Sequence, residues 1–245
     1  MNEYIVSILL IFVAAGLVKG ITGMGLPTLA MALLGSLMAP ASAAALLVVP
    51  SFVTNVWQLL AGPGALQTLY RLWPMMAGIA LGTLGSAGFM AKVDGQWSGL
   101  ALGACLVAYA IYALAAPTLH IPRRAETWLS PIAGLLTGVL TGATGVFVIP
   151  AVPYLQALNL GKDQLVQALG LSFTVSTVAL AFGLAAHGSL DTEQLGVSAL
   201  AIAPALVGMM FGQRIRAKIS PALFRRCFLS LLLLLGLELI SRPFL

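Results

Sequence analysis

Long apolar segments, separated by short polar loops, occupy almost the whole of this 245-residue chain. They cover approximately residues 4–37, 41–62, 70–91, 98–116, 128–158, 164–187, 194–213 and 221–241. A helix needs about 20 apolar residues to cross a lipid bilayer, and most of these segments match that length. Only 8% of the residues are charged, against about 25% in a soluble domain. The sequence therefore predicts an all-α integral membrane protein and excludes a soluble enzyme or a nucleic-acid-binding protein.

Two of the segments, 4–37 and 128–158, are too long for a single crossing. A helix over residues 4–37 would extend about 50 Å, whereas the hydrocarbon core is about 30 Å thick. Each segment is interrupted near its middle by glycines and threonines, followed by Pro27 or Pro150. Glycine permits the backbone angles of a tight turn, and proline suits the first turn of a helix. We therefore expect both segments to be broken into two helices.

The two broken segments resemble each other, and the likeness continues beyond them. AGLVKGITGMGLP at 15–27 aligns with AGLLTGVLTGATGVFVIP at 133–150 when short insertions are allowed. PSFVTNVWQLLAG at 50–62 aligns with LSFTVSTVALAFG at 171–183. The chain therefore contains an internal duplication.

The duplication extends to small residues at helical spacing, because Gly82 and Ser86 align with Gly208 and Gly212. Such spacings usually let transmembrane helices pack closely, and we favour that role for these four residues. We predict a single transmembrane domain over residues 1–245. Its repeats cover about 4–116 and 128–241, joined near 117–124.

The twelve basic residues distinguish two arrangements of these segments. If each broken segment crosses the membrane once, seven basic residues lie on one side and four on the other, leaving out Lys19. If each broken segment is a re-entrant hairpin, the division is nine to two, with only Lys92 and Arg242 opposite the rest. Basic residues concentrate on the cytoplasmic side, so we favour hairpins, both termini outside, and two inverted repeats. Eight plain crossings are the alternative.

The duplicated glycine–threonine motif and the Ser-Phe element of each half resemble the sulfite exporter TauE/SafE family of membrane permeases. The residues that carry the likeness are Gly16, Gly20, Thr22, Gly23, Gly25 and Pro27, and then Gly134, Gly138, Thr141, Gly142, Gly145 and Pro150. Leu26 departs from the pattern, since a small residue is expected before Pro27. The resemblance implies a bacterial inner-membrane transporter, usually an exporter, of small anions such as sulfite, sulfate-like oxyanions or organosulfonates.

The two breaks are predicted to form the anion site. A helix that begins at a break points its free N–H groups and the positive end of its dipole into the protein, which favours an anion. The candidates at these hairpin tips are Gly20, Thr22, Gly23, Gly25, Thr137, Gly138, Thr141, Gly142, Thr144 and Gly145. The alternative is that the glycines serve only close helix packing.

Polar residues of two further segments extend the predicted site. Ser51, Asn55 and Gln58 are spaced so that they lie on one face of a helix, and Ser172 and Ser176 are the counterparts of the first two. These residues either line the substrate pathway or form hydrogen bonds with neighbouring helices.

Lys19 is the one basic residue inside a long apolar segment. In the hairpin arrangement it lies near the tip and can meet the anion. If the segment crosses once, Lys19 lies at its far end and extends to the membrane interface. Glu238 falls late in the last segment, where we expect an interfacial position.

Motifs of enzymes are missing from the sequence, which has no HExxH, CxxC, Walker loop or GxSG with a histidine partner. We therefore predict no catalytic residue, metal ligand or cofactor. The predicted function is a secondary transporter that binds a small anion between the hairpin tips. A passive anion channel is the first alternative, and an intramembrane enzyme or assembly factor is the second. A coupling ion, proton or sodium, and a homo-oligomer are both compatible with the sequence.

Overall fold

The computed structural model describes residues 2–62, 64–115, 120–216, 218 and 220–242, so residues 117–119 of the expected junction lie outside this range. The described residues form helices and no strands. In chain order the helices are α1 (Asn2–Thr22), α2 (Leu26–Gly35), α3 (Pro40–Leu60), α4 (Ala65–Lys92), α5 (Gly95–Ala115), α6 (Arg123–Thr144), α7 (Ala151–Ala157), α8 (Lys162–Ala186), α9 (Thr192–Leu200), α10 (Ile202–Arg216) and α11 (Pro221–Ser241). Six helical stretches in this part of the chain are long and apolar enough to cross a membrane. The predicted all-α membrane fold is confirmed.

Both long apolar segments are broken, as predicted. The first break separates α1 from α2, and the second separates α6 from α7. Pro27 lies in the first turn of α2, and Pro150 immediately precedes α7. The segment 194–213 is also interrupted, between α9 and α10, which the sequence analysis did not predict.

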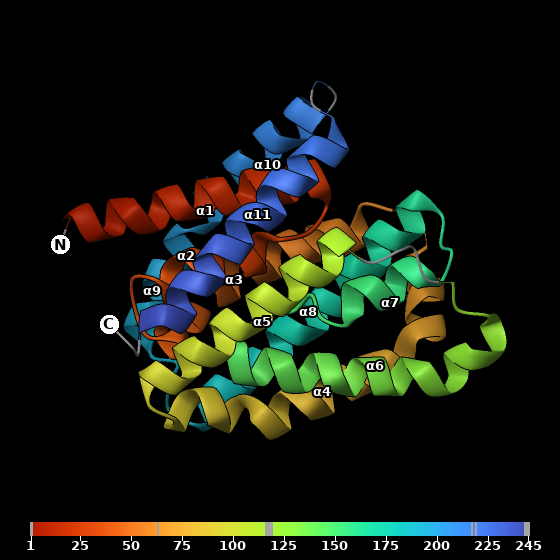
Figure 1. Ribbon diagram of the computed structural model, residues 1–245, viewed down its shortest axis with the longest axis horizontal. Coiled ribbons are helices and arrows are strands. Elements are labelled where there is room, and N and C mark those ends of the chain that lie inside the picture. The colour runs from red at the N-terminus through yellow and green to blue at the C-terminus, as the bar shows by residue number, and fades with distance from the viewer. Residues whose placement is uncertain (1, 63, 116–119, 217, 219, 243–245) are drawn as a thin grey trace.

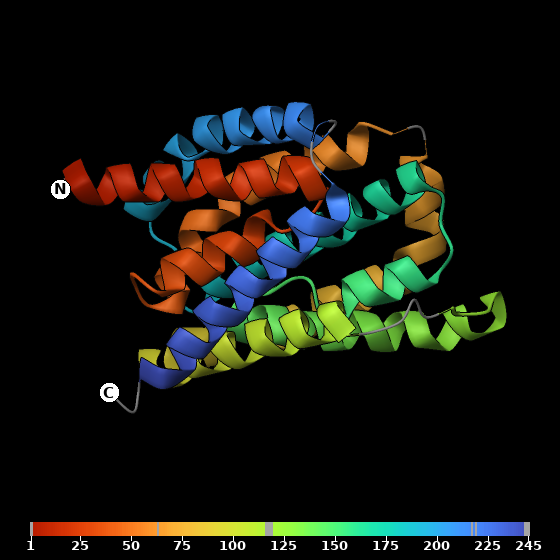
Figure 2. The same cartoon turned by 45° about the horizontal axis from the view of Figure 1, so that its top comes forward.

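After each break the chain doubles back. The start of α2 lies near Phe228, early in α11, and Ser36 at its end is bonded to Glu238, late in α11. Thus α2 runs parallel to α11 and leads back to the end of the molecule at which α1 begins (Figures 1 and 2). In the same views α7 leads back towards the end at which α6 begins. The start of α1 and the end of α11 lie at the same end of the molecule (Figure 1).

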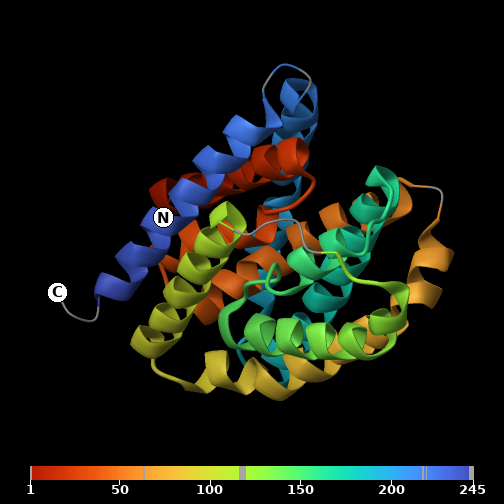
Figure 3. The ribbon, with the colours of Figure 1, turned by 45° about the vertical axis from the view of Figure 1, so that its right-hand side comes forward.

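Two pairs of parallel helices attach the hairpins to the rest of the molecule. Helix α1 packs along α10, and α6 packs along α4 (Figures 2 and 3). Glycines let the backbones of the two helices in each pair approach so closely that no side chain would fit at these positions. A Cβ atom at Gly20 would overlap the carbonyl oxygen of Met209, and one at Gly138 would overlap that of Ile79. The duplicated glycines inside these helices are therefore packing residues.

The two pairs use matching contacts, which correct the sequence alignment by one helical turn. Gly78 approaches Pro131 as Gly208 approaches Val13, and Gly82 approaches Leu135 as Gly212 approaches Leu17. Gly208 and Gly212 therefore correspond to Gly78 and Gly82, and the predicted match with Gly82 and Ser86 is wrong. The error arises because small residues recur at every fourth position along α4. The packing role predicted for Gly82, Gly208 and Gly212 is confirmed.

Helices α3 and α8 lie between these two pairs (Figures 2 and 3). They pack against each other, and α8 also packs against α4. Gly170 makes this contact close, since a Cβ atom there would lie 2.8 Å from the backbone nitrogen of Leu59. The polar faces predicted on these two helices are therefore turned into the middle of the molecule.

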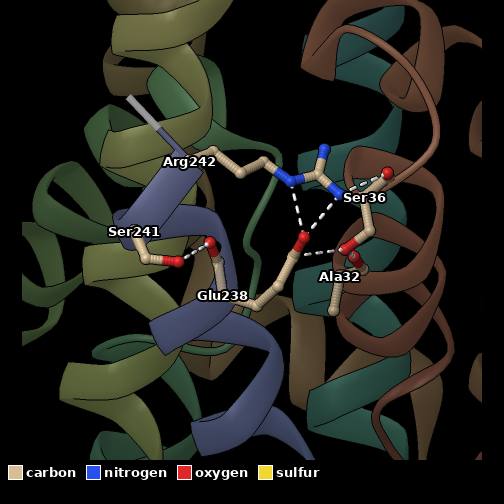
Figure 4. Close-up of polar contacts among 5 residues, drawn as sticks. All are labelled: Ala32, Ser36, Glu238, Ser241 and Arg242. Atoms are coloured by element: carbon tan, nitrogen blue, oxygen red, sulfur yellow. Dashed lines mark hydrogen bonds and ion pairs between the residues drawn. The ribbon is translucent and has the colours of Figure 1, made fainter. Parts of the chain in front are cut away.

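A polar contact ties the end of α2 to the end of α11 (Figure 4). Glu238 accepts hydrogen bonds from the Ser36 hydroxyl at 3.1 Å and from Nε of Arg242 at 2.6 Å. Arg242 also donates to the carbonyl oxygen of Ser36 at 2.6 Å. A cation is favourable there because carbonyl groups at the C-terminal end of a helix carry partial negative charge. Glu238 is thus held in an ion pair near the last turn of α11.

Candidate functional site

Lys19 lies in the last turn of α1, and its side chain is only 2% exposed. Its Nζ donates hydrogen bonds to Thr54 Oγ1, at 3.2 Å, and to Asn55 Oδ1. Both partners are neutral, and the ion pairs of the described residues, Arg71–Glu126 and Arg242–Glu238, do not involve it. The side chain therefore points into the protein between α1 and α3 and does not extend to the membrane interface.

Helices α3 and α8 carry further buried polar groups, and those of α8 are linked to this lysine through Asn55. Asn55 Nδ2 donates to Thr177 Oγ1 at 3.4 Å, which joins the polar faces of the two helices. The hydroxyls of Ser51, Ser172 and Ser176 are fully buried and have no hydrogen-bond partner within the described structure. A buried polar group without a partner costs roughly 1–3 kcal/mol, and these three hydroxyls on facing helices are available as donors to a polar ligand.

We call this set of residues the buried polar cluster. It consists of Lys19, Ser51, Thr54, Asn55, Ser172, Ser176 and Thr177.

The first hairpin tip is fixed next to the buried polar cluster by Gln58. Its Nε2 donates to the carbonyl oxygens of Gly23, at 2.8 Å, and of Val166, at 2.9 Å. Gly23 and Gly25 have φ angles of 77° and 97°, in the left-handed region where glycine is favoured. The turn therefore needs both glycines, and Gln58 holds it against α3 and α8.

Thr22 and Thr144 end their helices in the same way. Each hydroxyl donates to the carbonyl oxygen four residues earlier, at 2.9 and 2.7 Å. Each also accepts from the amide two residues later, at 3.1 and 3.3 Å. The glycine that follows, Gly23 or Gly145, has a positive φ in both halves. These hydroxyls stabilise the breaks, and their hydrogen bonds leave them less available to a ligand.

The second break lies at Gly145, the last of the residues predicted for the second hairpin tip. Gly142 is still inside α6, where a Cβ atom would overlap the carbonyl oxygen of Thr83, so its predicted place at the tip is wrong. The hydroxyls of Thr137 and Thr141 donate to backbone carbonyls of their own hairpin, at 2.7 and 3.3 Å. Apart from Gly145, the predicted tip residues of the second half thus bond to their own backbone or pack against α4.

The two hairpins meet, but through an apolar side chain. A Cβ atom at Gly145 would lie 2.7 Å from Cε of Met31, which is buried in the middle of α2. The second tip therefore rests against the first hairpin, whereas Lys19 and the unpartnered hydroxyls lie along α3 and α8. The structure brings Lys19 and Asn55 into direct contact, a contact that the sequence did not reveal.

A second polar feature lies where α4 and α6 begin. A pocket of about 400 Å³ is lined by Arg71, Pro74, Arg123, Glu126, Thr127 and Ser130. Arg71 is held by two hydrogen bonds to Glu126, at 3.0 and 2.6 Å, whereas Arg123 is exposed. In the sequence these arginines indicate only the topology, because no motif shows that α4 and α6 begin side by side.

Thr54 and Thr177 were also missed. Each is the direct neighbour of a predicted residue, Asn55 or Ser176, but lies one position away from the predicted helix face. Their hydroxyls donate to carbonyl oxygens of their own helices, at 2.8 and 2.7 Å, and accept from the site residues. A threonine next to a polar helix face was the available signal.

Comparison with known proteins relates this chain to a family of membrane exporters. The model of the family described as sulfite exporter TauE/SafE matches residues 8–239. A protein of Cupriavidus necator named "Probable sulfite/organosulfonate exporter TauE" is 26% identical over 227 residues, which cover 89% of this chain and 87% of that protein. No solved structure matches the chain. The match over nearly the whole chain confirms the resemblance: the protein is a multi-pass membrane protein that belongs to the sulfite exporter TauE/SafE transporter family.

Proposed function

We propose that this protein is a secondary transporter that exports small sulfur oxyanions or organosulfonates across the bacterial inner membrane. The observation that carries the proposal is Lys19, a buried amine that becomes cationic on protonation and whose hydrogen-bond partners are both neutral. A buried charge needs an opposite charge or a dense set of hydrogen bonds. An anion bound at Lys19 supplies that charge. The family and the name of the Cupriavidus necator protein support the substrate class and the direction.

The buried polar cluster suits the chemistry of a sulfonate or sulfite group. Such a group spreads its negative charge over three oxygen atoms, each of which accepts hydrogen bonds. The Lys19 ammonium supplies the positive charge, and the hydroxyls of Ser51, Ser172 and Ser176 supply donors without other partners. Hydrogen bonds to charged acceptors are roughly twice as strong as neutral ones. We propose that the predicted tip residues shape the surrounding hairpins and are not ligands of the anion. They are Gly20, Thr22, Gly23, Gly25, Thr137, Gly138, Thr141, Gly142, Thr144 and Gly145.

Burial of this cluster favours a carrier over the alternative of a channel. The exposed fraction of Ser51, Asn55, Ser172 and Ser176 is zero, so the cluster is closed to solvent. An anion reaches it only when helices move apart. A carrier opens such a site first to one side and then to the other, whereas a channel needs a continuous path.

We further propose that the two repeats are inverted and that each begins with a re-entrant hairpin. The matching contacts of α1 with α10 and of α4 with α6 support two equivalent halves. In Figures 1 and 2, α1 and α6 run in opposite directions, as inverted repeats require. The positive-inside rule then places Arg123 and Lys162 in the cytoplasm and both termini outside. A single transmembrane domain over residues 1–245 follows from this arrangement.

Counterflow in proteoliposomes tests the proposed transport. Vesicles preloaded with unlabelled methanesulfonate are expected to take up labelled methanesulfonate several times faster than vesicles preloaded with chloride. The acceleration arises because a carrier returns more quickly with a substrate bound. Liposomes without protein are the control. Uptake through the protein at the same rate with either internal anion would contradict the carrier and favour a channel.

A further inference from the structure

The charge balance around Lys19 is unusual for a buried lysine. Helix α1 packs against α2, α10 and α11, and Lys19 itself is bonded to α3. Neither α2 nor α3 contains an acidic, basic or histidine residue. The titratable residues of the other two helices are Arg214 and Arg216 on α10, and Arg225, Arg226, Cys227 and Glu238 on α11. None of these provides a negative charge at Lys19, because Glu238 is bonded to Arg242 and Ser36. On α8, which carries the other part of the buried polar cluster, Lys162 and Asp163 are exposed in the first turn.

The hydrogen bonds of the Lys19 side chain suit both the protonated and the neutral amine. As an ammonium, Lys19 has three donors, of which Thr54 and Asn55 accept two. The third then remains for a bound anion. As a neutral amine, it donates to the same two acceptors and carries no charge. The surrounding groups therefore hold the side chain in place whether or not it is protonated.

The energy of the charge depends on the anion. Burying an isolated ammonium in a dry interior is costly, whereas a bound anion in contact with the ammonium compensates its charge. The charged amine and the bound anion therefore stabilise each other. If the anion leaves, the ammonium has no opposite charge, and if the ammonium loses its proton, the anion has none.

We propose, on the basis of the transport function inferred above, that Lys19 couples anion transport to proton movement. When the anion binds, Nζ takes up a proton from water on the side to which the cluster is open. When the anion leaves on the other side, Nζ releases that proton to water there. The empty carrier then returns with a neutral lysine. One proton thus accompanies each monovalent anion in the same direction, and no net charge crosses the membrane. Export is then driven by the outward concentration gradient of the anion and is opposed by a proton gradient that is acidic outside.

Proton uptake by the wild-type protein is the first test. The purified protein in a weakly buffered, mildly alkaline solution with a pH indicator is mixed with methanesulfonate, whose own charge does not change in this range. The expected result is uptake of one proton for each anion bound. Anion binding without any proton uptake would overturn the proposal, and this measurement depends on no variant.

Lys19→Arg provides the second test, because a guanidinium stays charged under all conditions of the assay. This variant is expected to bind methanesulfonate without proton uptake and to keep anion exchange. It should lose uptake driven by a pH gradient. Lys92→Arg, at an exposed position near the end of α4, is the matched control and should behave as wild type. Uptake by Lys19→Arg that still follows the pH gradient would show that another group carries the proton.

Failure of the coupling and failure of the anion site give different results. If Lys19→Met binds methanesulfonate as wild type does, the site itself is wrong. If Lys19→Met loses binding but the wild-type protein takes up no proton, the site stands and only the coupling is refuted.

Discussion

Lys19→Met is expected to lower the affinity for methanesulfonate by about thirtyfold or more. Removing one partner of a buried charged contact costs roughly 2–5 kcal/mol, and each tenfold change in affinity corresponds to about 1.4 kcal/mol. Methionine keeps most of the length of the side chain but cannot pair with an anion. Titration of the purified variant by isothermal calorimetry measures the effect.

Folding of this variant should be preserved, which separates the effect from misfolding. Lys19 forms no ion pair among the described residues, so the substitution leaves no buried negative charge without a partner. Its melting temperature without ligand is therefore expected to equal or exceed that of wild type. Lys92→Met, at an exposed position, is the control for the loss of a positive charge. Equal affinity of Lys19→Met and wild type would exclude Lys19 from the site.

Gly82→Leu is expected to reduce the yield of folded protein at least about tenfold, because backbone cannot move aside as a side chain can. A Cβ atom at Gly82 would overlap the carbonyl oxygen of Leu135 and lie 2.8 Å from the backbone nitrogen of Val139. The contact between α4 and α6 would have to open. Size-exclusion chromatography of detergent extracts gives the yield of monodisperse protein.

Gly85→Leu is the matched control on the same helix. Beyond the neighbouring backbone of its own helix, no atom lies within 4 Å of a Cβ built at Gly85, which is exposed. Leucine also favours a membrane-spanning helix. This variant should therefore reach wild-type yield. Equal losses in both variants would show that the close contact of α4 and α6 is not what makes Gly82 necessary.

The sequence was sufficient for the helices and for the existence of the breaks. Length and hydropathy mark helices because every backbone polar group inside a bilayer must be paired within the protein. Pro27 and Pro150 mark the breaks because proline is favoured where a helix begins. The interruption between α9 and α10 was missed because no glycine–threonine motif precedes it.

The exact position of a break was harder to predict. Of Gly138, Gly142 and Gly145, the glycines predicted for the second hairpin tip, only Gly145 adopts a positive φ. The choice depends on contacts with α4, which are distant in sequence. The alignment of α4 with α10, its counterpart in the other repeat, was also ambiguous, because small residues recur at equal spacing along the helix.

The candidate site was predicted in composition but not in arrangement. Lys19, Ser51 and Asn55 were all named, yet the contact between Lys19 and Asn55 joins residues of two helices and follows from packing alone. The threonines near the breaks, Thr22, Thr141 and Thr144, were predicted to contribute to the anion site. They bond to backbone carbonyls instead, as threonine in a helix commonly does.

The most direct test of the anion site is the reactivity of a cysteine placed inside it. Ser176→Cys is made in a protein whose own cysteines, Cys105 and Cys227, are replaced by alanine. Membrane-impermeant thiol reagents are then applied to right-side-out and to inverted vesicles, with and without methanesulfonate. The account predicts labelling from both sides, slowed by methanesulfonate in both cases. Labelling at the same rate with and without the anion, in a variant that still transports it, would contradict a site at the buried polar cluster.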